Sequence, residues 1–128
     1  MEGSSNSKEK RKYPRLFMDL PLEYQVTDVP QAHGGLVVNL SEIGLLIQSV
    51  KNIPVGTHLN IAVLFPKAFE LANFEVLAEV VRKEIYWKED WEGYQYGLKF
   101  IQIRKEDHGK LTDLLSSDDE LERASCNL

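Results

Sequence analysis

The sequence predicts an all-β protein, an antiparallel barrel or sandwich of six strands that ends in a helix. This prediction rests on three observations. Most of the 128 residues fall in segments where apolar and polar side chains alternate, which is typical of half-buried strands. Turn-forming clusters separate these segments at intervals that suit antiparallel sheets. After Ile103 the alternation gives way to helical spacing.

Each predicted strand places apolar side chains two residues apart, so that one face is buried. The best example has Phe74, Val76, Ala78 and Val80 on one face and acidic residues on the other. A chain of this length can bury a sizeable core without disulfides or metal, so we expect one core. The six segments lie at 20–26, 36–40, 43–50, 59–65, 74–80 and 96–100.

Turns and a helix complete the predicted order of elements. Gly, Pro and Asp residues predict turns at 28–30, 33–35, 53–56 and 90–93. Beyond the last strand, Leu111, Leu114 and Leu115 follow helical spacing, which predicts a helix that closes one end of the sheet structure. Ser117 and Glu120 match a capping box and predict that a second short helix begins there.

Charge is distributed unevenly along the chain. Residues 1–15 hold five basic and two acidic side chains, whereas the rest holds ten basic and eighteen acidic ones. A basic segment on an acidic body indicates one anionic partner met at one place, and it argues against a broad nucleic-acid footprint. A solubilising tail is the alternative that charge alone leaves open.

Hydropathy and cysteine usage indicate the compartment. No apolar run approaches the roughly 18–20 residues that span a bilayer, and the polar residues 1–12 contain no apolar signal segment. Cys126 is the single cysteine, which excludes an intrachain disulfide and a zinc site built from cysteines. We therefore expect a cytoplasmic protein without membrane insertion.

The first candidate motif is an RxxxR segment at residues 11–15, just before the first strand. Arg11 and Arg15 each offer a planar fork of five donors, which suits phosphate oxygens or the O6/N7 edge of guanine. Pro14 restricts the backbone between them. RxxxR also arises by chance in a chain this charged.

The second candidate motif is the [D/N]xSxxG segment at residues 39–44, between the second and third predicted strands. Asn39 and Ser41 are two residues apart, so an extended backbone projects both to the same face. Gly44 lets backbone or ligand approach closely. The alternative is a turn in which Asn39 and Ser41 bond their own backbone and Gly44 relieves strain.

Together the two motifs resemble the signature of the PilZ domain family. The likeness extends to the segment 94–100, which is similar to the Gly-x-x-Phe strand of that family, and covers about residues 10–115. The resemblance implies a six-stranded antiparallel PilZ-like β-barrel with a C-terminal α-helix. We therefore expect a flexible basic N-terminal arm over 1–12, the barrel over 13–103 and a helical segment over 104–124.

The resemblance also implies a ligand, the second messenger cyclic di-GMP, bound on the outside of the barrel. Arg11 and Arg15 from the arm would close on it, and Asn39, Ser41 and Gly44 would form the wall of the site. Binding would then order the arm, and this change would signal to a downstream protein.

Three departures or additions qualify this site. Lys10 precedes RxxxR, at the position thought to influence whether one ligand molecule or a stacked pair binds. Asn39 replaces the family's frequent Asp, which weakens a charge-assisted bond to guanine N–H groups. Arg82, on the fifth strand, is a candidate for a further ligand contact or for a solvated strand edge.

Other classes of function have less support in the sequence. The three histidines are far apart and predict no metal site, and no catalytic motif is present, so we expect neither an enzyme nor a cofactor. An aromatic hairpin at 86–92 offers a protein-docking tip or core packing instead. A PilZ-like docking module without nucleotide binding and a small nucleic-acid-binding barrel are the alternatives, although the acidic body repels phosphate chains.

Overall fold

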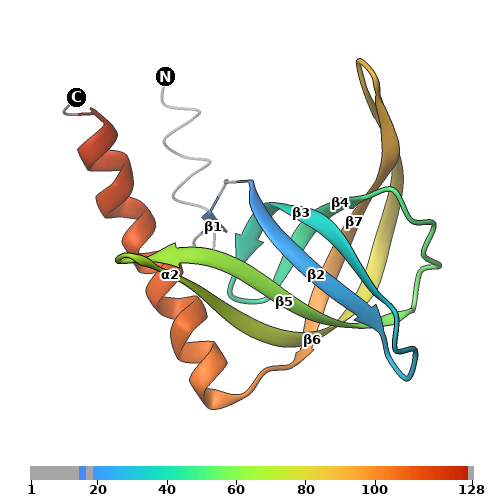
Figure 1. Cartoon of the computed structure of the whole chain (residues 1–128), viewed down its shortest axis with the longest axis horizontal. Coiled ribbons are helices and arrows are strands. Elements are labelled where there is room, and N and C mark those ends of the chain that lie inside the picture. The colour runs from blue at the N-terminus through green and yellow to red at the C-terminus, as the bar shows by residue number, and fades with distance from the viewer. Residues whose placement is uncertain (1–14, 17–18, 127–128) are drawn as a thin grey trace, which may run out of the picture.

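The computed structural model describes residues 15–16 and 19–126 and contains seven strands and one helix within them (Figure 1). The segment between the last strand and the helix is short, so the helix follows the sheet directly. The elements are β1 (Arg15–Leu16), β2 (Leu20–Val26), β3 (Ala32–Ser41), β4 (Gly44–Ser49), β5 (His58–Lys67), β6 (Glu70–Lys88), β7 (Trp91–Gln102) and α2 (Lys105–Cys126).

Six of the strands close into an antiparallel ring. The order is β3-β2-β5-β6-β7-β4, and pairing of β3 with β4 joins the two ends. The two-residue β1 adds to β3 outside the ring. This arrangement confirms the predicted all-β fold, with six antiparallel strands and a C-terminal helix, and it selects the barrel over the sandwich.

The core fills the ring because every strand turns alternate side chains inward. In β5, for example, Leu59, Ile61, Val63 and Phe65 are all buried. The same period continues in β6 and in the other strands. The inward residues elsewhere include Leu20, Leu22, Tyr24, Val37, Leu40, Leu45, Ile47, Phe74, Val76, Ala78, Val80, Tyr96 and Leu98.

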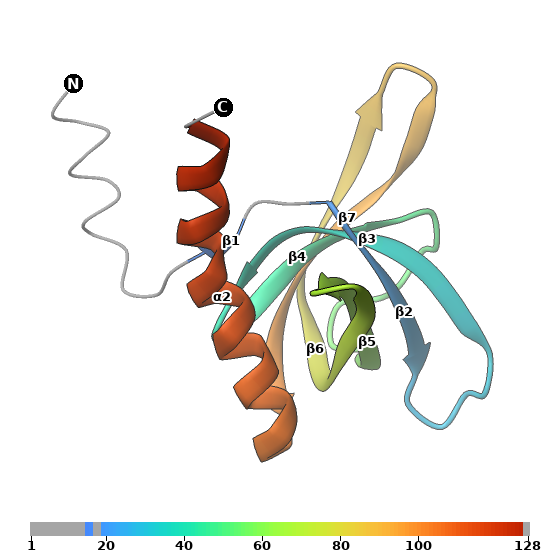
Figure 2. The same cartoon turned by 60° about the vertical axis from the view of Figure 1, so that its left-hand side comes forward.

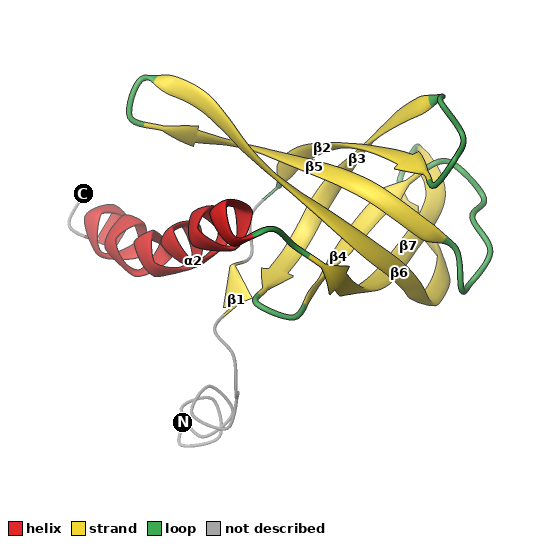
Figure 3. Ribbon diagram, turned by 90° about the horizontal axis from the view of Figure 1, so that it is seen from below, coloured by secondary structure: helices red, strands yellow, loops and turns green. Residues whose placement is uncertain are grey.

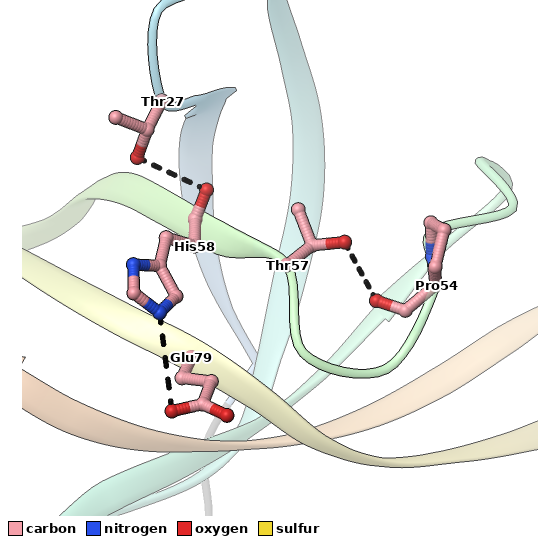
Figure 4. A network of polar contacts seen from close by, with 5 residues as sticks. All are labelled: Thr27, Pro54, Thr57, His58 and Glu79. Atoms are coloured by element: carbon pink, nitrogen blue, oxygen red, sulfur yellow. Dashed lines mark hydrogen bonds and ion pairs between the residues drawn. The ribbon is translucent and has the colours of Figure 1, made fainter.

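Two of the four predicted turns form at the predicted places, after β2 and before β5. Asp28 has a φ of 70° and Gly56 a φ of 96°, in the left-handed region that tight turns use. Figure 4 shows how the turn before β5 is held: Thr57 Oγ1 donates to Pro54 O at 2.7 Å, and Thr27 Oγ1 donates to His58 O at 3.2 Å.

The other two turns and the second helix differ from expectation. The predicted turn at 33–35 is wrong, because these residues lie inside β3, where a Cβ on Gly35 would lie 2.8 Å from Gln48 O. The last turn lies at 89–90, and Gly93 is already in β7. The helix runs without a break through Ser117, since no Gly or Pro interrupts it there.

Helix α2 closes one end of the ring (Figure 3). Leu111, Leu114 and Leu115 are buried against the core, as their spacing predicts. Asp107, 1% exposed, accepts a bond from the backbone N–H of Glu75 at 3.1 Å and another from Arg104 Nε at 3.0 Å. The first turn of the helix is thereby attached to β6.

Two buried tyrosines organise the loop that follows β4. The Tyr24 hydroxyl lies 2.8 Å from Ser49 Oγ. The Tyr96 hydroxyl donates to Lys51 O at 2.5 Å and accepts from the N–H of Ile53 at 2.7 Å. Burial is the main cause that raises the pKa of both phenols above the ordinary value of 10.0.

These shifts predict how stability depends on alkaline pH. Below about pH 10 both phenols are protonated in the folded and unfolded states, so their ionisation leaves the free energy of unfolding unchanged. Above that pH the unfolded chain loses the protons first, and stability falls as pH rises through the folded-state pKa values. Tyrosinate absorbance should show a component that appears above the ordinary tyrosine pKa, and Tyr96→Phe should reduce that component.

Tyr96→Phe should also cost about 1–3 kcal/mol of stability at neutral pH, because the N–H of Ile53 loses its acceptor. Urea unfolding measures this cost. A folded protein in which all tyrosines ionise together near the ordinary pKa would contradict the assignment.

Candidate functional site

The outer wall of the barrel carries a polar hollow across β3, β4, β7 and β6. Its volume is about 550 Å³, and we call it the wall hollow. The structure brings four of the predicted site residues together here and adds a second cation. The polar residues and glycines of its lining are Asn39, Ser41, Gly44, Arg82, Gly97 and Lys99.

A single row of paired residues forms the centre of the wall hollow. Asn39 is paired with Leu46, Leu46 with Gly97, and Gly97 with Arg82. Residues directly opposite in a sheet point to the same face. The row therefore places an amide at one end and a guanidinium at the other, with an apolar side chain and a glycine between them.

Two β-bulges aim the ends of this row outward. The register shifts between Val37 and Asn39 and again between Val80 and Arg82. Val37 and Val80 are fully buried, so strict alternation would turn Asn39 and Arg82 into the core. One extra residue in each strand reverses the side chains that follow.

Arg82 lies over the small surface that Gly97 leaves open. A Cβ on Gly97 would lie 3.4 Å from the Cβ of Arg82 and 3.7 Å from its Nε. Arg82 is exposed, so its donors remain available to a ligand. Glycine at this position gives the arginine side chain a flat place on the wall.

Ser41 and Gly44 have structural roles as well as a place in the hollow. Ser41 Oγ accepts from the N–H of Ile43 and donates to Gly44 O, each at 3.3 Å. A Cβ on Gly44 would lie 2.2 Å from Leu98 O, so the close approach is between the backbones of β4 and β7. The turn interpretation of this segment therefore holds for Ser41, and the residue also lines the hollow.

Lys99 is a lining residue that sequence analysis missed. It is exposed and lies opposite both Gly44 and Glu79 in the sheet. Alternation between Leu98 and Phe100 was enough to predict that Lys99 faces outward, but no motif pointed to it. With Arg82 it makes the wall hollow cationic, although the chain as a whole is acidic.

The chain enters the barrel beside this hollow. In β1 the backbone of Arg15 pairs with Ser41, and that of Leu16 pairs with Leu40. The RxxxR segment therefore ends next to the [D/N]xSxxG segment. The predicted site residues Lys10 and Arg11 lie outside the described residues.

Among the described residues, no group of three or more His, Cys, Asp or Glu side chains is placed to hold a metal ion. The one described helix is too polar to cross a bilayer.

The fold and the wall hollow define a small antiparallel barrel with a polar site on its outer surface. The sequence profile of the PilZ domain matches residues 9–117. The chain therefore belongs to the PilZ domain family. No curated protein matches the chain.

Several solved structures share the fold. MotI/DgrA, the inhibitor of motility of Bacillus subtilis, has a TM-score of 0.71 and 20% identity over 89% of this chain and 53% of that one. The PilZ domain of Escherichia coli YcgR, solved with c-di-GMP, has a TM-score of 0.70 and 14% identity over 92% and 98%. A tetrameric PilZ protein of Xanthomonas campestris has a TM-score of 0.58 and 13% identity over 98% of each chain. This chain thus spans about half of the Bacillus protein.

The double role of Gly44 predicts a loss of stability on adding one methyl group. Gly44→Ala should cost about 1–3 kcal/mol, because β4 and β7 must separate to admit the Cβ. Gly109→Ala is the matched control: a Cβ on Gly109, in α2, would meet no other part of the protein within 4 Å, and the change should stabilise by roughly 0.5–1 kcal/mol. Urea unfolding measures both. If Gly44→Ala is as stable as wild type, β4 and β7 lie farther apart at this position than in this structure.

Proposed function

We propose that this chain is a sensor that binds cyclic di-GMP in the wall hollow, catalyses no reaction and signals to a partner protein. The observation that carries the proposal is the convergence of Asn39, Ser41, Gly44 and Arg82 on one hollow, beside the strand that ends the RxxxR segment. Support comes from family membership and from the YcgR PilZ domain, which was solved with c-di-GMP.

The chemistry of the wall hollow suits a dianion that carries guanine bases. Arg82 and Lys99 supply positive charge for phosphate oxygens, and Asn39 supplies an amide that can both donate and accept. The apolar Leu46 lets a planar base lie against the wall, beside the Arg82 side chain that covers Gly97. The wall hollow therefore supplies part of the donors that such a ligand needs, and the N-terminal arm supplies the others.

The N-terminal arm supplies the remaining contacts in this proposal. Arg11 and Arg15 close on the ligand with bidentate bonds and cation–π stacking, and Lys10 adds a point charge. Closure orders residues 1–12 against the barrel of residues 13–103, and the partner protein recognises that order. The helical segment of residues 104–124 stays attached to the barrel end.

Calorimetric titration with cyclic di-GMP tests the site. Arg11→Ala and Arg15→Ala should each cost about 1.5–3 kcal/mol, close to tenfold or more in affinity, because each removes charge-assisted bonds. Arg82→Ala and Lys99→Ala should weaken binding by about threefold to tenfold. Lys51→Ala is the control: it removes one exposed cation in the loop after β4, outside the wall hollow.

Salt dependence separates a dinucleotide from a nucleic acid. A compact dianion gives a shallow slope of affinity against salt, whereas a polynucleotide that contacts many phosphates gives a steep one. The proposal is overturned if the folded protein shows no heat and no thermal shift with saturating cyclic di-GMP. Unaltered affinity in both arm variants would remove the arm from the mechanism.

A further inference from the structure

A second hollow lies on the same outer surface, at the opposite end of β4. Its volume is about 620 Å³, and its lining comes from the tip of the β6–β7 hairpin, from β3 and from the end of β4. Figures 1 and 2 show that this hairpin tip projects from the ring of strands. We call it the hairpin groove. The residues that matter for its chemistry are Asp19, Gly34, Leu36, Tyr86, Glu89 and Trp91.

Two aromatic side chains form one wall of the hairpin groove. The rings of Tyr86 and Trp91 meet edge to face, with centroids 5.6 Å apart. The indole of Trp91 lies over Gly93, where a Cβ would be 2.5 Å from the ring carbon Cη2. Both rings are half-buried, and packing fixes them in place. Rigid, partly exposed aromatic residues of this kind are typical anchors of protein interfaces.

The opposite wall is low and apolar. Gly34 of β3 leaves a small surface without a side chain, and Leu36 and Val50 beside it are 42% and 63% exposed. An exposed apolar surface next to anchored aromatic rings indicates a docking site. The absence of a side chain at Gly34, where a Cβ would meet nothing nearer than Leu22 O at 3.9 Å, lets another main chain come close.

The charge of the hairpin groove is opposite to that of the wall hollow. Asp19, Glu89 and Asp90 line the groove against one cation, Lys88. Negative charge at the rim repels phosphate groups, so a nucleotide or a nucleic acid is a poor occupant. Lysine or arginine side chains on a partner complement this rim and suppress wrong partners.

The hairpin groove lies between two strand edges that are unpaired. Because β4 ends at Ser49, the β3 segment 32–35 and the β7 segment 91–93 have no strand beside them on that side within the described ranges. Each is paired on its other side, to β2 and β6 respectively. Free backbone groups at such edges recruit an extended peptide, and neighbouring pockets select its side chains.

We propose that the hairpin groove binds an extended segment of a partner protein in which lysine or arginine alternates with aliphatic or aromatic residues. The apolar side chains would contact Tyr86, Trp91 and Leu36, and the cations would reach Glu89 and Asp90. This deepens the proposed function, on which it rests for the existence of a partner. The site itself is separate from the wall hollow and needs no nucleotide.

Selection from a library of random peptides of about ten residues, displayed on phage, tests the proposal on the whole chain without nucleotide. Enriched peptides should be basic and apolar, and a synthetic copy should bind wild type in fluorescence polarisation. Trp91→Ala should weaken that binding at least about tenfold, and Glu89→Lys combined with Asp90→Lys about tenfold.

Trp87→Ala is the matched control, because Trp87 is 70% exposed on the opposite face of the same hairpin. It should change affinity less than about twofold. The variant with Glu89→Lys and Asp90→Lys keeps the test valid if Trp91→Ala misfolds, because Glu89 and Asp90 are both exposed at a turn. The proposal is overturned if the wild-type protein enriches no peptides beyond those that the Trp91→Ala variant enriches, or if the enriched peptides are acidic. It is also overturned if sedimentation shows a dimer of the wild-type protein that Trp91→Ala dissociates, because a second copy of the chain would then occupy the groove. Binding of cyclic di-GMP is scored separately, so either proposal can fail alone.

Discussion

Pairing of β3 with β4 is the interaction on which the rest of the structure depends, because it turns a six-stranded sheet into a ring. Without it both strands would be open edges, and the inward faces of all six strands would lose their common core. The turn that joins the two strands is held by Ser41, which bonds to Ile43 and Gly44. The residues that close the barrel are therefore also the residues that line its outer hollow.

This overlap constrains what can change in the site. Gly44 cannot gain a side chain without separating β4 from β7, and Ser41 cannot lose its hydroxyl without weakening the turn. Arg82 and Lys99, by contrast, are exposed, and neither side chain holds the turn or sets the distance between strands. Packing thus fixes Ser41 and Gly44 in the wall hollow, whereas it does not constrain the two cations.

Much of this arrangement could be predicted from alternation and from two short motifs, and the failures have physical causes. Asn39 and Ser41 share a face as their spacing predicts, because the bulge comes before Asn39 and not between the two. Gly34 and Gly35 suggested a turn, but both lie within a strand, and the close approach of Gln48 O explains the glycine at position 35. Lys99 was missed because its neighbours across the sheet come from distant parts of the chain.

Asp107 joins the helix to the barrel through the backbone of Glu75 rather than through another side chain. If this bond broke while the helix stayed packed, the carboxylate of Asp107, a residue that is 1% exposed, and the N–H of Glu75 would both lose a partner away from water. Leu111, Leu114 and Leu115 of α2 seal the core at the same end. Helix and barrel are consequently one cooperative folding unit, so truncation before Lys105 would open the hydrophobic interior to water instead of releasing an intact smaller domain.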